Sequence, residues 1–597
     1  MADKALGISI AAIIIAIIAI GIAAYYASRA PVGAPRTVTK VVTTVIKYTP
    51  TSSVVTVTKT TTKTATTTSV VTTSAVSGPP ILTGNFKKDV IAIGKYLESQ
   101  GVHTVKFSVW ATGDPNSVMR MYGLYEAAYV INKIWANNGI NVKIVMSKFW
   151  ESSFKKLYDE FLSAVPQKTN GDFFVNSYIY IANLAQDGYI LDLTNYIKAY
   201  WNSVFKDFYP AIMNAAKWKG HYYGVPQDTE ARPIYVRKDV AACMGWNIKN
   251  LATLVKEGKF TWHDMFRMAE KAVKMGCAKW GLIHRRGSAH PDLMQFIFAY
   301  GGTLYDPKTG KLVFDVPAVY KWFATEYAFA QHGLLPKDMM AWSWAQQIHP
   351  TVVNDCHNSP TGCTLFFIGG TWHWTEWQTK PYYYDPKTHK QRPLTPEEVE
   401  KKFYYMLFPA GDPGDKPVTL SQPFMWMIAS NAGRNNPKYD QLKNVYHELA
   451  FLMVVEASNP QINAIHSVIS GHVPVRRAAA ALLKNQTWVN DLIHLKLNLS
   501  PTVMQAIKPI IERTANPINI QFLANVSYML DYTHLAPSHP LYPKLAGYFA
   551  DAIDKVLRGE MTPAQAVNYM IQKIKADPEL SAAVEIVGKI PTNWTFP

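Results

Sequence analysis

The hydrophobic and polar positions divide the chain into three stretches of different character. Residues 5–28 carry no charge and are rich in Ile and Ala, and residues 37–78 alternate Val and Thr without any acidic residue. After Pro80, apolar residues recur at the spacing of amphipathic helices, interrupted by short apolar runs of strand length. The pattern predicts an apolar segment, a low-complexity spacer and a large folded region.

The first stretch has the length of a membrane span. About 20 apolar residues cross a bilayer, and two tyrosines end the run, where interfacial aromatic residues are common. The start at Lys4-Ala5-Leu6 resembles the pilin-like signals of some archaeal surface proteins, which implies a cut after Ala5 or no cut at all, with the apolar helix kept as an anchor in either case. A conventional signal-peptidase site is the alternative. We predict that residues 1–34 are a signal or membrane anchor and that the chain after them lies outside the cell.

The Thr/Ser-rich residues 35–80 are predicted to be a stalk, because low-complexity polar sequence offers too little apolar area for a core. A chain of roughly 40 residues, extended by ~3.3 Å each, reaches beyond about 100 Å. O-glycosylation fits its hydroxyl-rich composition. Such a stalk holds the folded region away from the membrane.

The folded region begins with a βαβαβ pattern. Starting with a helix and alternating with strands, the expected elements cover residues 86–99, 105–111, 121–139, 141–147, 154–165 and 171–180. This order predicts a parallel sheet covered by helices, with ligands bound at the carboxyl ends of the strands. The alternation resumes after Thr261, and the last third of the chain is mostly helical.

The composition narrows the class of partner. Sixty Lys and Arg against 43 Asp and Glu give a net charge of +17, but the cations are scattered and no nucleic-acid signature accompanies them. We expect a solvated basic surface and no nucleic-acid partner. Aromatic residues make up 13% of the chain, enough to build flat ligand platforms as well as cores.

Four cysteines and four sequons fit an external chain. Cys356 and Cys363 bracket a short loop that suits a disulfide, which leaves Cys243 with Cys277; zinc binding by these thiols is the alternative. The Asn-x-Ser/Thr sequons predict N-glycosylation at Asn485, Asn498, Asn525 and Asn593.

Six segments of the folded region carry a resemblance to a known family. They read VWATGDPNS, GHYYGVPQDTEARPIYVRKDV, LFFIGGTWHWTEW, PVTLSQPFMWMIAS, SVISGHVPVRRAA and GEMTPAQAV. In their order and spacing they resemble the extracellular solute-binding proteins of ABC importers, especially the carbohydrate-binding group typified by maltose-binding protein. The resemblance implies a two-lobed, periplasmic-binding-protein-like α/β fold with an interlobe cleft, a sugar ligand, and an ABC permease with its ATPase as partner. It implies lobe I over residues 81–230 with 422–470, and lobe II over residues 231–421 with 471–597.

By this resemblance, Trp372 matches the family's stacking tryptophan and Asp114 matches an acidic ligand contact. Aromatic rings stack on the apolar faces of sugars, and carboxylates bind sugar hydroxyls strongly. Capping of the following helix is the alternative role for Asp114. Trp374 is a further candidate, although residues two apart on a helix face different directions, so Trp374 or Trp377 is expected in the core.

Three charged residues crowd the segment that the resemblance makes the first crossing between the lobes. They are Asp228, Glu230 and Arg232. Buried charges are costly unless they are paired or bound to a ligand. We expect at least one of them to contact the ligand; internal pairing of Arg232 with Glu230 or Asp228 is the alternative.

Five further residues are candidate ligand contacts because of their places in the predicted fold. Ser177 and Tyr178 follow the third strand, Arg286 precedes a helix, and Trp426 and His472 lie at the second and third presumed crossings. For each of these, a hydrogen-bonded structural role is the alternative.

The sequence lacks the motifs that mark common catalytic sites. The HExxH-like string at His447 ends at Phe451, and no G-x-S-x-G elbow, P-loop or dinucleotide fingerprint is present. We predict a binding protein that is not an enzyme and needs no cofactor or metal. The alternatives are a surface glycoside hydrolase with two carboxylates meeting in the cleft, and a filament or adhesin subunit.

Overall fold

The βαβαβ pattern after residue 100 forms a five-stranded sheet. The computed structural model describes residues 79–285, 291–357, 359 and 361–597. β1 (Thr104–Thr112) runs parallel to β2 (Lys143–Glu151) on one side and to β3 (Phe173–Ser177) on the other, as expected from the sequence. β16 (Phe424–Ile428) comes from much later in the chain and lies antiparallel to β3 and to β6 (Val225–Asp228). The strand order is therefore β2-β1-β3-β16-β6.

Helices cover both faces of this sheet because its inner strands are apolar on both sides. In β3, Phe173 and Val175 enter one core cluster, whereas Phe174 between them enters a second cluster. The first cluster includes side chains of α2 (Phe86–Ser99), α3 (Met119–Asn137) and α16 (Tyr439–Ala457). The second includes α4 (Phe154–Ala164), where Phe161 stacks on Phe174 with ring centroids 4.1 Å apart.

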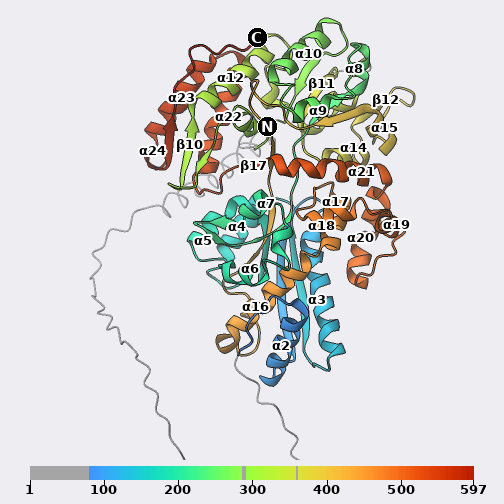
Figure 1. The fold of residues 1–597 in the computed structure, drawn as a ribbon, viewed down its shortest axis with the longest axis vertical. Coiled ribbons are helices and arrows are strands. Elements are labelled where there is room, and N and C mark those ends of the chain that lie inside the picture. Colours follow the sequence, from blue (N-terminus) through green and yellow to red (C-terminus); the bar gives the residue numbers. More distant parts are fainter. Residues whose placement is uncertain (1–78, 286–290, 358, 360) are drawn as a thin grey trace, which may run out of the picture. The chain divides into compact units, whose positions relative to one another are not determined.

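A second sheet has the order β14-β7-β11-β8 and lies in the upper half of Figure 1. Its strands are β7 (Ile234–Arg237), β8 (Trp280–Ile283), β11 (Thr364–Ile368) and β14 (Phe403–Met406). β11 is parallel to β8 and antiparallel to β7. The carboxyl ends of β8 and β11 therefore meet at one edge of the sheet.

The C-terminal helices return to the half that holds the second sheet. α10 (Trp262–Lys274) packs on β8 and β11. α12 (Val316–Gln331) packs on α22 (Tyr542–Arg558) and α23 (Pro563–Ala576). β18 (Val584–Val587) then pairs in parallel with β10 (Lys311–Asp315). The end of the chain is thus part of this second core.

Several segments run side by side between the two sheets. β15 (Thr419–Ser421) pairs in parallel with β17 (Thr533–Leu535). The backbone N–H of Arg232 donates to Thr419 Oγ1 at 2.7 Å, and the N–H of Val473 donates to the carbonyl of Thr229 at 2.7 Å. The chain therefore crosses between the sheets more than once.

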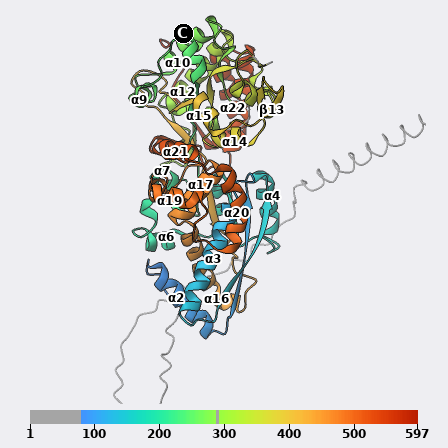
Figure 2. The same ribbon diagram turned by 90° about the vertical axis from the view of Figure 1, so that its right-hand side faces the viewer.

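The helices between these crossings pack first on one half and then on the other (Figure 2). α17 (Pro460–Ser470) and α20 (Pro501–Thr514) both contact α3 beside the first sheet. α21 (Pro517–Val526) contacts α15 (Pro396–Lys402) beside the second and also keeps a contact with α17. The chain therefore passes from the half with the first sheet to the half with the second sheet after α20.

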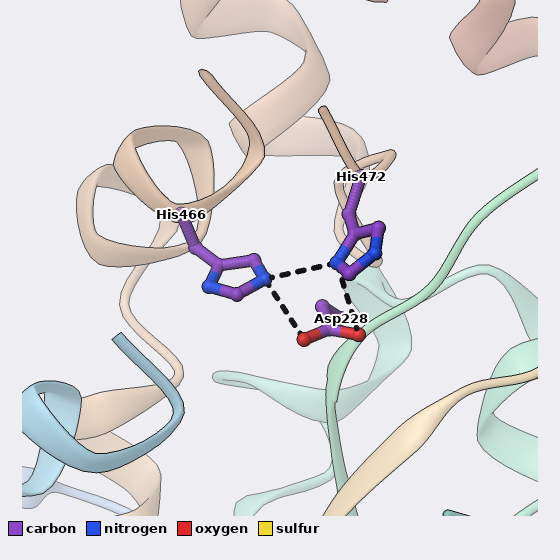
Figure 3. Close-up of side chains that lie close together, drawn as sticks. All are labelled: Asp228, His466 and His472. Atoms are coloured by element: carbon purple, nitrogen blue, oxygen red, sulfur yellow. Dashed lines mark hydrogen bonds and ion pairs between the residues drawn. The ribbon is translucent and has the colours of Figure 1, made fainter. Parts of the chain in front are cut away.

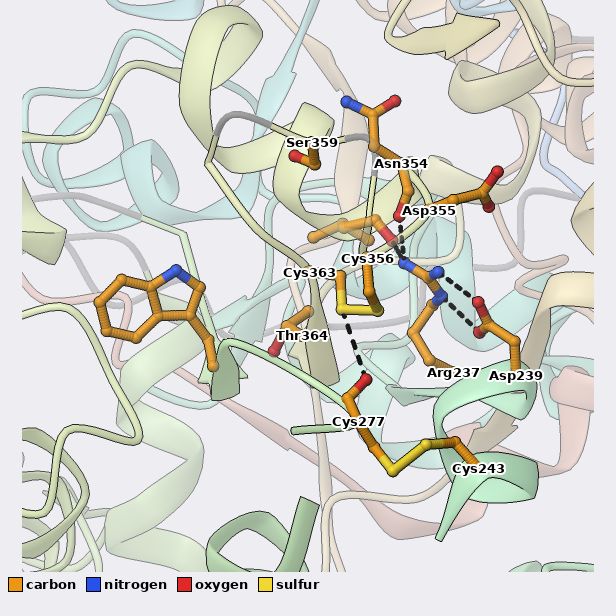
Figure 4. Close-up of a disulfide and its surroundings, with 12 residues drawn as sticks. Arg237, Asp239, Cys243, Cys277, Asn354, Asp355, Cys356, Ser359, Cys363 and Thr364 are labelled. Carbon is orange, nitrogen blue, oxygen red and sulfur yellow. Dashed lines mark hydrogen bonds and ion pairs between the residues drawn. A yellow bond between two sulfur atoms is a disulfide. The ribbon is translucent and has the colours of Figure 1, made fainter. Parts of the chain in front are cut away.

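Two disulfides lie close together in the half that holds the second sheet (Figure 4). Cys243 is bonded to Cys277 and Cys356 to Cys363, with Cα atoms 5.8 and 4.7 Å apart. Both expected pairs are therefore formed in the structure. Because all four sulfurs are in disulfides, they are not available as thiolate ligands for zinc.

The predicted anchor at residues 1–34 and nearly all of the predicted stalk at 35–80 fall outside the described residues. Within the described ranges, no helix combines the length and the apolar character that a membrane span needs. The anchor and the stalk therefore stay predictions.

Candidate ligand-binding site

A cavity of about 370 Å³ is lined by residues from both halves of the described chain. The turn after β1 contributes from the first sheet, and the turn and helix after β11 contribute from the second. The lining consists of Asp114, Pro115, Asn116, Arg285, Trp344, Trp372, Thr375, Glu376, Thr379, Lys380, Ser470 and Arg513. The site thus lies at the carboxyl ends of strands, where open α/β sheets bind ligands.

Trp372 is placed in the cavity by the tight turn that follows β11. It is the residue before α14 (His373–Thr379), and its side chain is half-buried. A Cβ atom on Gly370 would lie only 1.7 Å from the Trp372 ring, so the close approach of ring and backbone requires glycine there. The sequence prediction of a tryptophan at this position of a cleft agrees with the geometry.

Trp374 points away from the cavity into the core. Its ring is 2% exposed and stacks on Phe522 with centroids 4.2 Å apart, and its Nε1 donates to Asn519 at 3.1 Å. Because Trp372 and Trp374 are two positions apart, the start of α14 directs them to different sides. Trp377 is also buried. The geometry gives Trp374 a packing role.

Asp114 lines the cavity and also organises its own turn. Its carboxylate accepts hydrogen bonds from the N–H of Asn116 at 2.7 Å and from the hydroxyl of Ser117 at 2.8 Å. Arg513 donates to Asn116 at 2.5 Å, which ties this turn to α20. Asp114 is exposed and lines the cavity, and its carboxylate has further acceptor positions beyond these two bonds. A ligand contact is compatible with this geometry. The capping alternative is wrong, because α3 has Val118 as its N-cap and no side-chain capping bond.

Sequence reasoning missed Trp344 and Arg285, which line the cavity together with Trp372. The guanidinium carbon of Arg285 lies 4.8 Å from the ring centroid of Trp344 and 5.1 Å from that of Trp372. Trp344 begins a π-helical turn over Trp344–Ile348, a local irregularity that is frequent at functional sites. The sequence gives no signal that separates Trp344 from the buried Trp342 two residues before it.

Glu376, His349 and His373 form a polar group beneath the cavity. The Nε2 atoms of His349 and His373 lie 3.7 and 3.9 Å from the Glu376 carboxylate, which accepts a hydrogen bond from Tyr382 at 3.0 Å. Burial raises the pKa of Glu376. Burial lowers the pKa of both histidines well below the usual range, so both are neutral at neutral pH.

The three charged residues of the first crossing are paired internally, and Figure 3 draws one of them, Asp228, with its neighbours His466 and His472. Arg120 binds both oxygens of Asp228, at 2.7 and 3.1 Å, and His466 Nε2 lies 2.8 Å from the same carboxylate. Burial alone would raise the pKa of Asp228, but Arg120, His466 and His472 together outweigh it and hold that pKa well below the usual range. Arg232 pairs with Glu230 at 2.8 Å and with Asp292. The expected pair of Arg232 with Glu230 is therefore formed, whereas Asp228 pairs with Arg120 instead of Arg232.

The remaining predicted contacts are buried in hydrogen-bonded positions or lie outside the described chain. The Ser177 hydroxyl accepts from Gln422 at 3.2 Å, and the Tyr178 hydroxyl donates to the carbonyl of Ala536 at 2.6 Å. Trp426 is 1% exposed and donates to the carbonyl of Arg120 at 3.0 Å. His472 Nδ1 lies 3.3 Å from His466 Nε2, in the group drawn in Figure 3. Arg286 falls outside the described residues.

Comparison with known families decides the class of the protein. Residues 124–434 match the family described as bacterial extracellular solute-binding protein. The chain belongs to this family. Members of the family bind solutes outside the cell for ABC transporters and are not enzymes, so this solute-binding protein is a binding component and not a glycoside hydrolase.

Solved structures share the periplasmic-binding-protein-like α/β fold of this solute-binding protein. The sugar-binding protein MalE from Xanthomonas citri is 16% identical with a TM-score of 0.54, over 80% of this chain and 97% of MalE. The cyclic α-maltosyl-1,6-maltose binding protein from Arthrobacter globiformis is 14% identical with a TM-score of 0.53, over 79% and 98%. MalE3 of T. maritima with bound maltose is 15% identical with a TM-score of 0.52, over 79% and 99%.

Proposed function

We propose that this solute-binding protein captures a saccharide in the cavity between its two sheets and delivers it to an ABC permease. The observation that carries the proposal is the half-buried ring of Trp372 in a cavity that also contains Asp114 and Glu376. A sugar ring offers an apolar face to an indole and hydroxyl groups to carboxylates. The cavity combines both kinds of contact.

The proposed mechanism is closure of two lobes around the ligand. Lobe I is built on the first sheet and lobe II on the second, and both supply cavity residues, so the contacts are complete only when the lobes are together. The sequence placed a lobe boundary at residue 470. Because α20 packs on α3 and α21 packs on α15, we propose that lobe I extends through α20.

The proposed location is the outer face of the membrane, with residues 1–34 as anchor and 35–80 as stalk. The family is extracellular. The four sequon asparagines, Asn485, Asn498, Asn525 and Asn593, are all exposed, as N-glycosylation requires. The two disulfides fit an oxidising exterior.

The test is titration calorimetry of the purified full-length chain with glucose, maltose, maltotriose and cellobiose. We expect at least one of them to bind, and Trp372→Ala to weaken that binding by about 30-fold, as for a buried aromatic anchor. Trp201→Ala is the matched control, because Trp201 is 38% exposed and lies outside the cavity lining described above. Unchanged affinity in Trp372→Ala would show that the stacking role is wrong, and absence of binding to any saccharide would contradict the proposed ligand class.

A further inference from the structure

The two tryptophans of the cavity hold a side chain of the protein itself. Trp344 and Trp372, which we name the tryptophan slot, both contact the guanidinium group of Arg285. Arg285 Nη1 also lies 3.3 Å from Asp292 Oδ2, and Asp292 is bound in turn by Arg232. The Arg285 side chain is 16% exposed, so it occupies space that would otherwise face the cavity.

The histidines beneath the slot have defined tautomers. Trp377 Nε1 donates to His349 Nδ1 at 2.9 Å, and the N–H of Gly370 donates to His373 Nδ1 at 2.8 Å. A neutral imidazole that accepts at Nδ1 carries its proton on Nε2. Both Nε2 atoms are therefore N–H donors, and both are buried without a hydrogen-bond partner among the described residues.

This arrangement disfavours a metal ion at the same place. The ligand atoms of His349, His373 and Glu376 lie within 4.8 Å of one another, which is close enough to surround a cation. A nitrogen that carries a proton cannot coordinate a metal, and moving the proton to Nδ1 would break the bonds from Trp377 and Gly370. The group offers two donors and one carboxylate acceptor instead.

Arg285 does not match this set of donors and acceptors. A guanidinium group has only donors, so it cannot accept hydrogen bonds from His349 or His373. The Nε atom of Arg285 itself has no hydrogen-bond partner within the described part of the chain. Buried polar groups are normally hydrogen-bonded, so an occupant with both acceptors and donors fits better. A hydroxyl group has this combination, because it accepts through its lone pairs and donates its proton.

We propose that Arg285 holds the place of the ligand, and that a hydroxyl-bearing ring displaces its guanidinium group from the tryptophan slot. In the bound state the ring stacks on Trp344 and Trp372, and its hydroxyls accept from His349 and His373 and donate to Glu376. This inference rests on the proposed function and adds the class of group, a polyhydroxylated ring, and a residue that limits its affinity. Asp292 keeps Arg232 as a partner when Arg285 leaves.

Removal of the Arg285 side chain tests the inference, because the inference predicts tighter saccharide binding, whereas loss of a ligand contact would weaken it. In Arg285→Ala the ligand no longer replaces a cation–π contact, so we expect about tenfold tighter binding of the saccharides that bind the wild-type chain. Trp344→Ala is expected to weaken binding, because the slot loses one wall. Arg267→Ala is the control, because Arg267 lies on the surface with a side chain that is 62% exposed.

The measurement is calorimetry of the full-length variants with glucose, maltose, maltotriose and cellobiose. Arg285→Gln, which keeps a polar side chain of similar length, replaces Arg285→Ala if the alanine variant does not fold. Weaker or unchanged binding by the variant, while the wild-type chain binds, overturns the displacement of Arg285 and leaves the proposed function intact. Binding by the variant alone supports the displacement. Absence of binding by both chains overturns the proposed function and this inference with it.

Discussion

Two buried polar groups of this protein contain similar residues and differ in how they are paired. At the first crossing, the Asp228 carboxylate has Arg120 on both oxygens and His466 beside it. Beneath the cavity, Glu376 accepts from Tyr382, but His349 and His373 stay beyond hydrogen-bond distance. A paired carboxylate serves the fold, whereas donors without partners beside a cavity are available to a ligand. The contrast separates charges that are paired within the fold from groups that we propose to bind the ligand.

The largest expected effect comes from the paired group. Asp228→Asn leaves Arg120 buried without its counter-charge, so the free energy of unfolding is expected to fall by about 3–5 kcal/mol. Denaturant unfolding of the wild-type and variant chains measures this. The control is Asp159→Asn, which removes the exposed pair with Lys155 and is expected to cost about 0.5 kcal/mol or less. Similar costs for the two variants would contradict the structural role of Asp228.

A smaller effect on stability, and a larger one on binding, is expected from Trp344. The ring is half-buried at the cavity, so Trp344→Ala should cost about 1 kcal/mol in the free energy of unfolding and weaken saccharide binding by about tenfold. Trp426→Ala is the comparison variant. This ring is 1% exposed, so its loss leaves a cavity in the core and lowers the free energy of unfolding by about 3–5 kcal/mol. Equal losses of unfolding free energy in the two variants would show that Trp344 is a core residue like Trp426 and would contradict its place in the tryptophan slot.

The smallest effect is a change in pH dependence. Because burial raises the folded-state pKa of Glu376 above its ordinary value of 4.5, its stabilising contribution is present below that pH and is lost as the pH rises through the folded pKa. Glu376→Gln should therefore gain stability relative to the wild-type chain as the pH rises above 4.5. Asp228 has a lowered pKa and the opposite slope, with stability lost on the acid side. Denaturant unfolding at several pH values measures both pH dependences. If the free energy of unfolding of Glu376→Gln changes with pH in parallel with that of the wild-type chain, the raised pKa of Glu376 is wrong.

The helices and strands were predictable from the sequence where the apolar residues of a segment follow either the helical or the strand spacing. The alternation of strand and helix patterns predicts β1, β2 and β3 and the helices between them, and the spacing on α14 separates Trp372 from Trp374. The change of side after α20 was not predictable, because a helix with an apolar face can pack on either half. Only the tertiary contacts of α20 with α3 decide it.

The candidate site was predictable only in its local parts. Asp114 and Trp372 follow strands directly, so the turn places them at the cavity. Asp228 pairs with Arg120, 108 positions away in the sequence, and with His466 on another helix. No local sequence pattern predicts such pairs. Arg285 and Trp344 belong to the site through the tertiary fold alone. The ligand roles of the other predicted residues stay predictions.

The two cystines have a consequence for the opposite ends of the strands beside them. Cys277 lies just before β8 and Cys363 directly before β11, whereas Arg285 and Trp372 follow the far ends of the same two parallel strands. Each disulfide thus anchors the chain near the start of one strand, and the pairing of β8 with β11 carries this restraint toward Arg285 and Trp372. A chain kept in a reducing environment would lose this restraint, so thiol oxidation after export becomes a condition for a correctly shaped recognition surface.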